Sequence, residues 1–488
     1  MPALIALFAS TFMSPRFLGI QADETYSPWP AQRLLRGDLP YRDVFTHRPP
    51  LDVLGNAAAQ ALLGEGLTAS RLLQLASMIA VGYLLFALLR RWGATLAEAG
   101  AGALVPACVC FPFWPLPASH WQALPLACAA VLALESRPLS EDGVSPAGWV
   151  LGAGVLAGLT GLVMQPEGAA ICLWLAARVW GGAAPRRELA LLVAGVAIPL
   201  SLCALTLALA GIGGAAFDCL VAFPLLHYKS VFNDVTLWGS APTTFGFVRE
   251  SYGAPGVSLF VLAGLLPLAA LGLALERLWR DRSRAAAAAL AGVVLILGLF
   301  FKGRADWMHL MFNLPFLLIA AAQLVLSSER TLLRRAAWAW LGLALLASSW
   351  LLALSLARGV TPGQAFEVDA QERARVQRLL ATLPPPLRDA PALSLPYGAP
   401  LYFYRAAEAP RIDWVCLPSL GYNPPGQREE IARWLEEREV PVVILEWSPL
   451  GLGFLREPSP IRDALQAYGS YAKVGGSVIL IRKGRGGG

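Results

Sequence analysis

Asp23 and Glu24 form an acidic pair directly after a short apolar run at the start of the chain. A carboxylate that faces a partly dry cavity at a membrane surface has a raised pKa and can accept a proton as a general base. The same pair can instead be a solvated boundary between a helix and a loop. The chemistry that this pair performs therefore depends on which other groups share its surroundings.

Other ionisable or hydrogen-bonding residues that could take part in chemistry gather at the ends of apolar runs and in two long polar segments. The four histidines show no H-x-x-x-H spacing, so no metal site is predicted from local sequence. A divalent metal held by residues from distant segments remains open, and no cofactor is predicted with certainty. The further candidates are Tyr41, His47, Arg48, Glu167, His227, Lys302, Arg304, Asp306 and His309.

The composition requires that most of the chain lies in a membrane. Of the 488 residues, 56% are hydrophobic and 15% are charged, and the mean hydropathy is +0.55, whereas an average soluble domain has roughly 25% charged residues. The net charge of +6 does not indicate nucleic-acid binding, because the basic residues form short clusters between apolar runs. The seven cysteines contain no C-x-x-C pair that would suggest zinc.

Apolar windows of about 20 residues predict an α-helical polytopic membrane protein with about eleven transmembrane helices. Small residues between Gly154 and Gly168 have the spacing that lets two membrane helices approach closely. The predicted spans lie near 2–14, 66–89, 97–113, 119–135, 147–164, 167–181, 188–211, 256–276, 285–301, 308–327 and 336–357.

The arginine clusters predict the orientation. Arg90-Arg91, Arg186-Arg187 and the basic residues at 277–284 and 330–335 fall in alternate short loops, as expected for cytoplasmic loops. The N-terminus then lies in the cytoplasm. Because the number of spans is odd, the long loops at 15–65 and 212–255 and the chain beyond residue 358 lie on the other side. Long loops on one face indicate that this face carries the function.

The last part of the chain, 359–488, is predicted to be a small soluble α/β domain that follows a transmembrane domain at 1–358. Its sequence has amphipathic helix patterns at 370–382 and 426–438 and short apolar strands at 442–446 and 477–481. A helix followed closely by a buried strand favours a layered α/β arrangement.

The first polar loop resembles the first periplasmic loop of the GT-C glycosyltransferases. The likeness rests on the acidic pair, on Pro40-Tyr41-Arg42-Asp43 and on His47-Arg48-Pro49-Pro50-Leu51. This superfamily includes the protein O-mannosyltransferases and the lipid A aminoarabinose transferase. The R-x-D-x-x-H segment from Arg304 to His309 is similar to one common in bacterial members. The chain departs from the family at Met164-Gln165-Pro166, where members often have a Lys.

The resemblance implies a GT-C-like fold and a sugar transfer in a bacterial plasma membrane. The donor would be a polyprenyl-phosphate sugar and the acceptor a lipid, glycan or protein on the extracytoplasmic side, with inversion in a single displacement. Membrane lipids would be the other partners, and nucleic acid would not be one. By resemblance Asp23 is the base and Glu24 the second acid. Arg48, Lys302 and Arg304 would bind the donor phosphate, and substrate contacts would come from Tyr41, His47, Glu167, His227, Asp306 and His309.

Two other functions stay open. A lipid or small-solute transporter would favour inverted repeats and charge near the middle of the bilayer, and the sequence shows neither. A non-catalytic member of the same fold would use the C-terminal domain to bind glycans.

Overall fold

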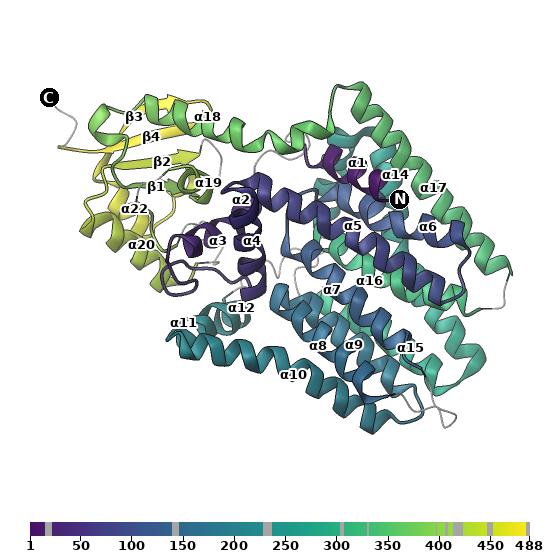
Figure 1. Ribbon diagram of the computed structural model, residues 1–488. Helices are drawn as coiled ribbons and strands as arrows, with labels where there is room; N and C mark the ends of the chain where they lie inside the picture. Colours follow the sequence, from purple (N-terminus) through teal and green to yellow (C-terminus); the bar gives the residue numbers. More distant parts are fainter. Residues whose placement is uncertain are drawn as a thin grey trace.

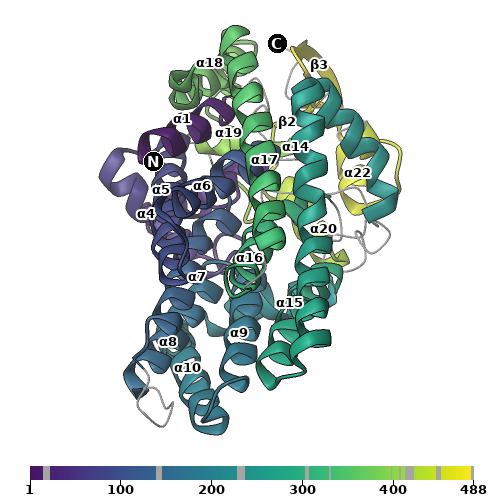
Figure 2. The same ribbon diagram turned by 90° about the vertical axis from the view of Figure 1, so that its right-hand side faces the viewer.

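The computed structural model describes residues 1–14, 22–138, 146–227, 237–302, 307–328, 331–396, 398–405, 408–412, 423–446 and 452–484. A bundle of helices and a smaller domain with a β-sheet lie end to end (Figure 1). We call the end of the bundle nearer this domain the domain side, and the opposite end the far side. Figure 2 shows the far side facing the viewer.

Each of the predicted spans coincides with a helix among the described residues. Within the described ranges, six segments are long and apolar enough to cross a membrane, namely Leu67–Arg91, Leu96–Phe113, Pro185–Leu209, Thr244–Asp281, His309–Leu326 and Thr331–Ala357. The chain is therefore a multi-pass membrane protein, and the number of eleven crossings stays a prediction. The bundle helices are α1 (Pro2–Phe12), α5 (Leu67–Arg91), α6 (Leu96–Val105), α7 (Ser119–Glu135), α8 (Ala147–Val163), α9 (Gln165–Trp180), α10 (Pro185–Leu209), α14 (Leu237–Asp281), α15 (Arg284–Lys302), α16 (Trp307–Leu326) and α17 (Thr331–Ala357).

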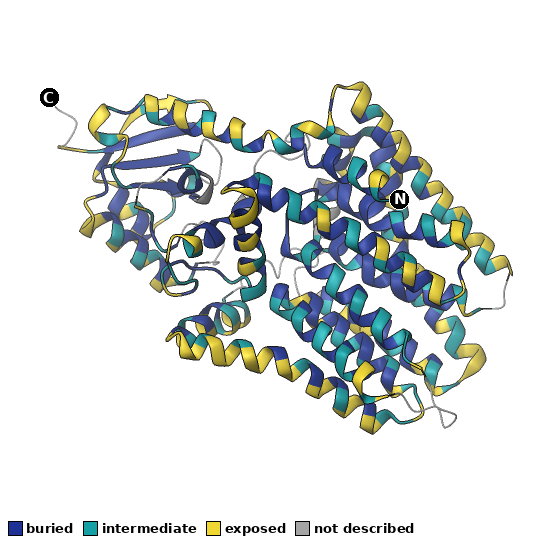
Figure 3. Ribbon diagram, in the orientation of Figure 1, coloured by how far each residue is buried: buried dark blue, intermediate teal, exposed yellow. Residues whose placement is uncertain are grey.

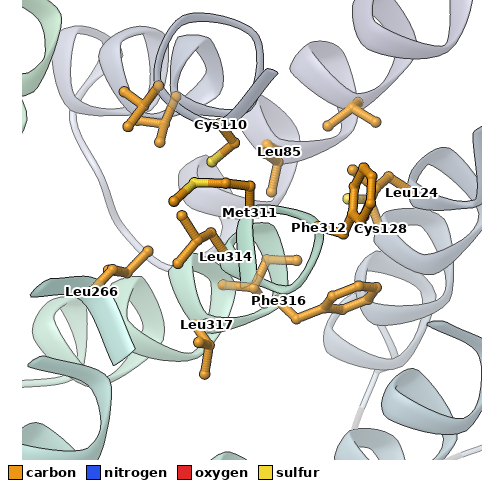
Figure 4. Close-up of a cluster of buried hydrophobic side chains, with 14 of the residues drawn as sticks. Leu85, Cys110, Leu124, Cys128, Leu266, Met311, Phe312, Leu314, Phe316 and Leu317 are labelled. Carbon is orange, nitrogen blue, oxygen red and sulfur yellow. The ribbon is translucent and has the colours of Figure 1, made fainter. Parts of the chain in front are cut away.

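Helix α16 forms the centre of the bundle. In its apolar window 72% of the residues are buried, against 17% in α10. Figure 4 shows side chains of α16 meeting those of α5, α7, α14 and the π-helical turn η1 (Pro106–Cys110). The exposed leucines of α10 form an outer surface (Figure 3). A helix that is buried on all sides is typical of a bundle core, whereas the exposed apolar face of α10 suits contact with lipid.

Helices α8 and α10 touch through their backbones. A Cβ added at Gly154 would lie 2.3 Å from the Leu192 carbonyl oxygen, and one added at Gly195 would lie 2.3 Å from the Leu151 carbonyl oxygen. The close approach predicted from the small-residue spacing is thus confirmed. Close backbone packing compensates for the weak drive for apolar helices to associate within lipid.

Replacing Gly154 by Leu is expected to lower stability by about 1–3 kcal/mol or more, because backbone atoms cannot move aside for the new side chain. Gly152→Leu is the matched control, since a Cβ at Gly152 meets nothing within 4 Å. Thermal unfolding of both variants in detergent measures the difference. Equal melting temperatures for the two would contradict the packing at Gly154.

The C-terminal domain contains a four-stranded mixed sheet in the order β1-β2-β4-β3. Strand β1 (Ala392–Leu395) pairs in parallel with β2 (Val442–Glu446), while β4 (Ser477–Arg482) pairs antiparallel with both β2 and β3 (Tyr468–Val474). Helices α18 (Val368–Ala381), α19 (Ala399–Phe403), α20 (Pro425–Glu437) and α22 (Pro460–Leu465) complete the domain. The two predicted helices and two predicted strands are confirmed, and β1 and β3 are additional.

The sequence predicts the two long segments at 15–65 and 212–255 as loops, but their described residues include short helices. The first segment contains α2 (Ala22–Thr25), α3 (Pro28–Leu35) and α4 (Pro50–Leu63), and the second contains α11 (Gly213–Phe217) and α12 (Phe223–Leu226) before α14 begins. These helices lie between the bundle and the C-terminal domain (Figure 1). They form a middle layer that covers the domain side of the bundle.

Candidate functional site

Tyr41 fixes the turn that carries His47 and Arg48. Its φ is 73°, its side chain is 1% exposed, and its hydroxyl donates a hydrogen bond of 3.0 Å to the Arg48 carbonyl oxygen. Arg411 of the C-terminal domain donates to the Tyr41 carbonyl oxygen at 3.3 Å. Burial raises the pKa of Tyr41, so the hydroxyl stays a neutral donor. This geometry favours a positioning role for Tyr41 over direct substrate contact.

The Arg48 guanidinium makes only weak contacts with the described residues around it. Its guanidinium lies 5.4 Å from the Tyr26 ring, and its Nη1 lies 3.4 Å from the Met164 sulfur, a weak acceptor. In the described part of the chain no salt bridge reaches Arg48, and its Nε is buried without a hydrogen-bond partner. Burial raises the pKa of the nearby Asp52 carboxyl, and the Arg48 charge opposes that rise. Arg48 is therefore suited to bind an anion.

His47 lies in an aromatic setting beside Arg48. Its ring centroid is 5.3 Å from that of Tyr26 and 5.7 Å from that of Phe223. Burial and the Arg48 charge lower the pKa of His47 to about 3, so the imidazole is neutral at physiological pH. Phe223 also lies 6.2 Å from the His227 ring, so α12 brings His227 to the same side of the site.

His120 and Glu167 form a close pair on the domain side of the bundle. The His120 Nδ1 lies 2.5 Å from a Glu167 oxygen, and the two side chains are 12% and 3% exposed. The His120 ring stacks on Phe312 at 4.0 Å, and the His309 ring meets it edge-on at 6.1 Å. If Glu167 accepts the Nδ1 proton, Nε2 is left to contact a ligand. Glu167 and His309 were among the predicted substrate contacts, whereas no role was predicted for His120.

The junction of α8 and α9 joins these two groups of residues. Gln165 donates a 3.5 Å hydrogen bond to the His47 carbonyl oxygen, and Met164 contacts Arg48. Glu167 follows two residues later in α9. The fold thus brings His47, Arg48 and the His120–Glu167 pair to one place, although they come from three separate parts of the chain.

Glu24 is held in a different environment. Its two oxygens accept hydrogen bonds from Arg71 Nε at 2.5 Å and Nη2 at 3.0 Å, and both side chains are 0% exposed. Arg71 Nη1 also donates to the carbonyl oxygens of Met13 and Ala365. Because both carboxylate oxygens are committed to Arg71, the geometry favours a structural role for Glu24 and gives no support to a catalytic one.

Comparison with known proteins gives matches only in three dimensions. No protein-family model and no curated protein matches the sequence. Among solved structures, ArnT from Cupriavidus metallidurans bound to undecaprenyl phosphate matches with a TM-score of 0.56 and 13% identity, over 99% of this chain and 97% of that one. The chain has a GT-C-like fold.

Two other glycosyltransferases share this GT-C fold with the chain. The Archaeoglobus fulgidus oligosaccharyltransferase in complex with zinc and sulfate matches with a TM-score of 0.51 and 14% identity, over 96% of this chain and 71% of that one. The mycobacterial arabinofuranosyltransferase AftD matches with a TM-score of 0.50 and 14% identity, over 99% of this chain and 40% of that one. The predicted resemblance to GT-C enzymes is confirmed at the level of the fold.

The side chains of four predicted site residues are not among those that the structure describes. The backbone of Asp23 belongs to α2 and that of Lys302 to α15, but their side chains lie outside the described part of the structure, as do Arg304 and Asp306. No group of three or more His, Cys, Asp or Glu side chains that could hold a metal occurs among the described residues. The roles of these four residues stay predictions.

Proposed function

We propose that this protein is a membrane glycosyltransferase that moves a sugar from a polyprenyl-phosphate donor to an extracytoplasmic acceptor. The observation that carries the proposal is Arg48, which has no salt bridge to any of the described residues and lies beside neutral His47 on the domain side of a GT-C-like fold. An arginine with free donors can bind a phosphate in a bidentate manner. The similar ArnT structure holds undecaprenyl phosphate, which supports the same class of donor here.

The proposed reaction is an inverting single displacement. Asp23 accepts the proton of the acceptor hydroxyl, whose oxygen forms a bond to the anomeric carbon of the sugar. The bond from that carbon to the phosphate oxygen breaks, and its electron pair leaves with the polyprenyl phosphate. Arg48, Lys302 and Arg304 stabilise the phosphate charge, because oriented cations act more strongly in a water-poor site than in bulk solvent. His120, oriented by Glu167, binds a sugar hydroxyl.

The positive-inside rule gives the orientation proposed for the site. Helix α5 ends at Arg91 on the far side, and α10 begins next to Arg186 and Arg187 at that same end (Figure 1). Basic residues of this kind mark cytoplasmic ends of membrane helices. The domain side, which carries Arg48 and the His120–Glu167 pair, then faces away from the cytoplasm of a bacterial plasma membrane.

Replacing Arg48 by Gln tests the proposal. Losing a charge-assisted hydrogen bond costs about 1.5–3 kcal/mol, so transfer of radiolabel from undecaprenyl-phosphate sugars is expected to fall roughly 10- to 150-fold. Arg42→Gln is the control, because Arg42 lies in the same loop and pairs with Asp43 at the surface with 57% of its side chain exposed. Equal transfer by both variants would overturn the proposal. Uptake of labelled lipid into sealed vesicles without sugar transfer would indicate a transporter.

A further inference from the structure

A cavity of about 480 Å³ lies on the far side of the bundle, away from the candidate site. It is lined by residues of α5, α6, α14, α16 and α17, and Figure 2 shows this end of the molecule. Its lining is aliphatic and aromatic apart from Glu98 and Arg334. A Cβ added at Gly272, which lines the cavity, would meet nothing within 4 Å. The cavity therefore has room for further hydrocarbon at this wall.

The two charged groups in the cavity are satisfied by their neighbours. Glu98 accepts hydrogen bonds from Arg334 Nε at 2.7 Å and Nη2 at 2.5 Å, and from the Trp338 indole at 2.7 Å. The remaining lining offers water few partners, and water needs two to four of them to occupy a buried site stably. The volume is in the range of roughly 300–1,000 Å³ that ligand pockets have. A hydrocarbon chain is the occupant that this lining suits.

Cationic side chains surround the far-side end of the cavity. Arg90 Nη1 donates a 2.5 Å hydrogen bond to the carbonyl oxygen of Ala94, a lining residue, and its side chain is exposed. Arg277 Nη1 donates to Ser327 Oγ at 2.6 Å, next to the lining residue Leu326. The charge of Arg334 is already balanced by Glu98, so Arg90 and Arg277 are the cations that remain for a headgroup among the described residues at this end. Basic pockets between membrane helices suit the phosphate of an anionic lipid.

Tryptophan side chains occupy the same end of the cavity. Trp92 and Trp338 both line it, and tryptophans are enriched where membrane helices meet the headgroups. The polar end of the cavity therefore lies at the level of the lipid phosphates, and its apolar part extends toward the acyl chains.

We infer that this cavity binds an anionic phospholipid, with an acyl chain between α14, α16 and α17 and the phosphate between Arg90 and Arg277. The charges favour an anionic headgroup over a zwitterionic one. This site is separate from the proposed transfer site, and its occupation does not depend on the proposed function. With the orientation proposed above, the lipid comes from the cytoplasmic leaflet.

The occupant can be tested by filling the cavity. Wild-type protein, Gly272→Leu and Gly298→Leu are placed in vesicles of equal parts phosphatidylglycerol and phosphatidylcholine with a trace of undecaprenyl phosphate. Retained lipids are then counted by native mass spectrometry. We expect wild type and Gly298→Leu to retain phosphatidylglycerol and Gly272→Leu to lose it. Gly298 is a matched control, because it is an exposed helical glycine that meets nothing within 4 Å and does not line the cavity.

The headgroup preference is tested by Arg90→Gln and Arg277→Gln. Each basic residue near an anionic lipid contributes about 1 kcal/mol, so each variant is expected to lower the ratio of bound phosphatidylglycerol to phosphatidylcholine about fivefold. Equal retention of both phospholipids by wild type would overturn the headgroup assignment. Unchanged retention of phosphatidylglycerol by Gly272→Leu would show that this lipid does not occupy the cavity. If wild type retained undecaprenyl phosphate instead, and Gly272→Leu lost it, the occupant would be the polyprenyl lipid and the inference would be wrong. Neither result would affect the transfer measured with Arg48→Gln.

Discussion

Asp23→Asn is expected to lower sugar transfer by about 10²–10⁴-fold, the usual contribution of a general base. Asparagine keeps nearly the same shape as aspartate but cannot accept the proton of the acceptor hydroxyl. The initial rate of transfer from a radiolabelled undecaprenyl-phosphate sugar measures the effect. Donor binding should change little, because the proposed phosphate contacts come from Arg48, Lys302 and Arg304.

Asp38→Asn is the matched control for this prediction. Asp38 lies in the same polar segment and pairs with Arg33, with 33% of its side chain exposed. Its replacement should leave transfer within about twofold of wild type, since Asp38 makes none of the proposed contacts to donor or acceptor. If Asp23→Asn transferred sugar as fast as Asp38→Asn, the base would have to be sought elsewhere in the site.

Glu24→Gln should affect stability far more than Asp23→Asn does, although the two residues are neighbours. It removes the carboxylate that neutralises Arg71 in an environment where both side chains are 0% exposed. Leaving one partner of a buried ion pair uncompensated costs about 3–5 kcal/mol. Thermal unfolding in detergent should show a large loss for Glu24→Gln and for Arg71→Met.

The double variant Glu24→Gln with Arg71→Met separates the loss of the pair from the cost of an unpaired charge. Because it leaves no isolated charge, its loss should be smaller than the sum of the two single losses. Glu408→Gln is the control, because Glu408 pairs with Arg438 at the surface with 47% and 59% of the side chains exposed. A fully additive double variant, or a Glu24→Gln protein as stable as Glu408→Gln, would show that the buried pair does not hold the fold.

The helical pattern of the bundle could be predicted from the sequence because a membrane span is a local property. About 20 apolar residues suffice to define it, and the basic residues at helix ends predict an orientation. The middle layer could not be predicted in this way. Helices α2, α3 and α4 are too short to cross a membrane, and short helices gain most of their stability from tertiary packing. In α4 the buried polar residues Asp52, Asn56 and Gln60 show this dependence on packing.

The site was predicted only in part, for the same physical reason. The sequence singled out His47, Arg48, Glu167 and His309 by type and by position at helix ends. The closest contact among these groups involves His120, which is 47 residues from Glu167 along the chain. His120 is the second residue of the apolar helix α7, and no carboxylate near it in the sequence indicates a pair.

The acidic pair of the first loop shows what the sequence can determine and what requires the tertiary structure. By itself the sequence determined that two carboxylates follow an apolar run and that this segment resembles the first loop of GT-C enzymes. It could not assign roles to them, because the groups that surround a buried side chain come from distant parts of the chain. Only the tertiary structure decided that Glu24 pairs with Arg71. The two residues are distant in the sequence and meet because the helices pack together.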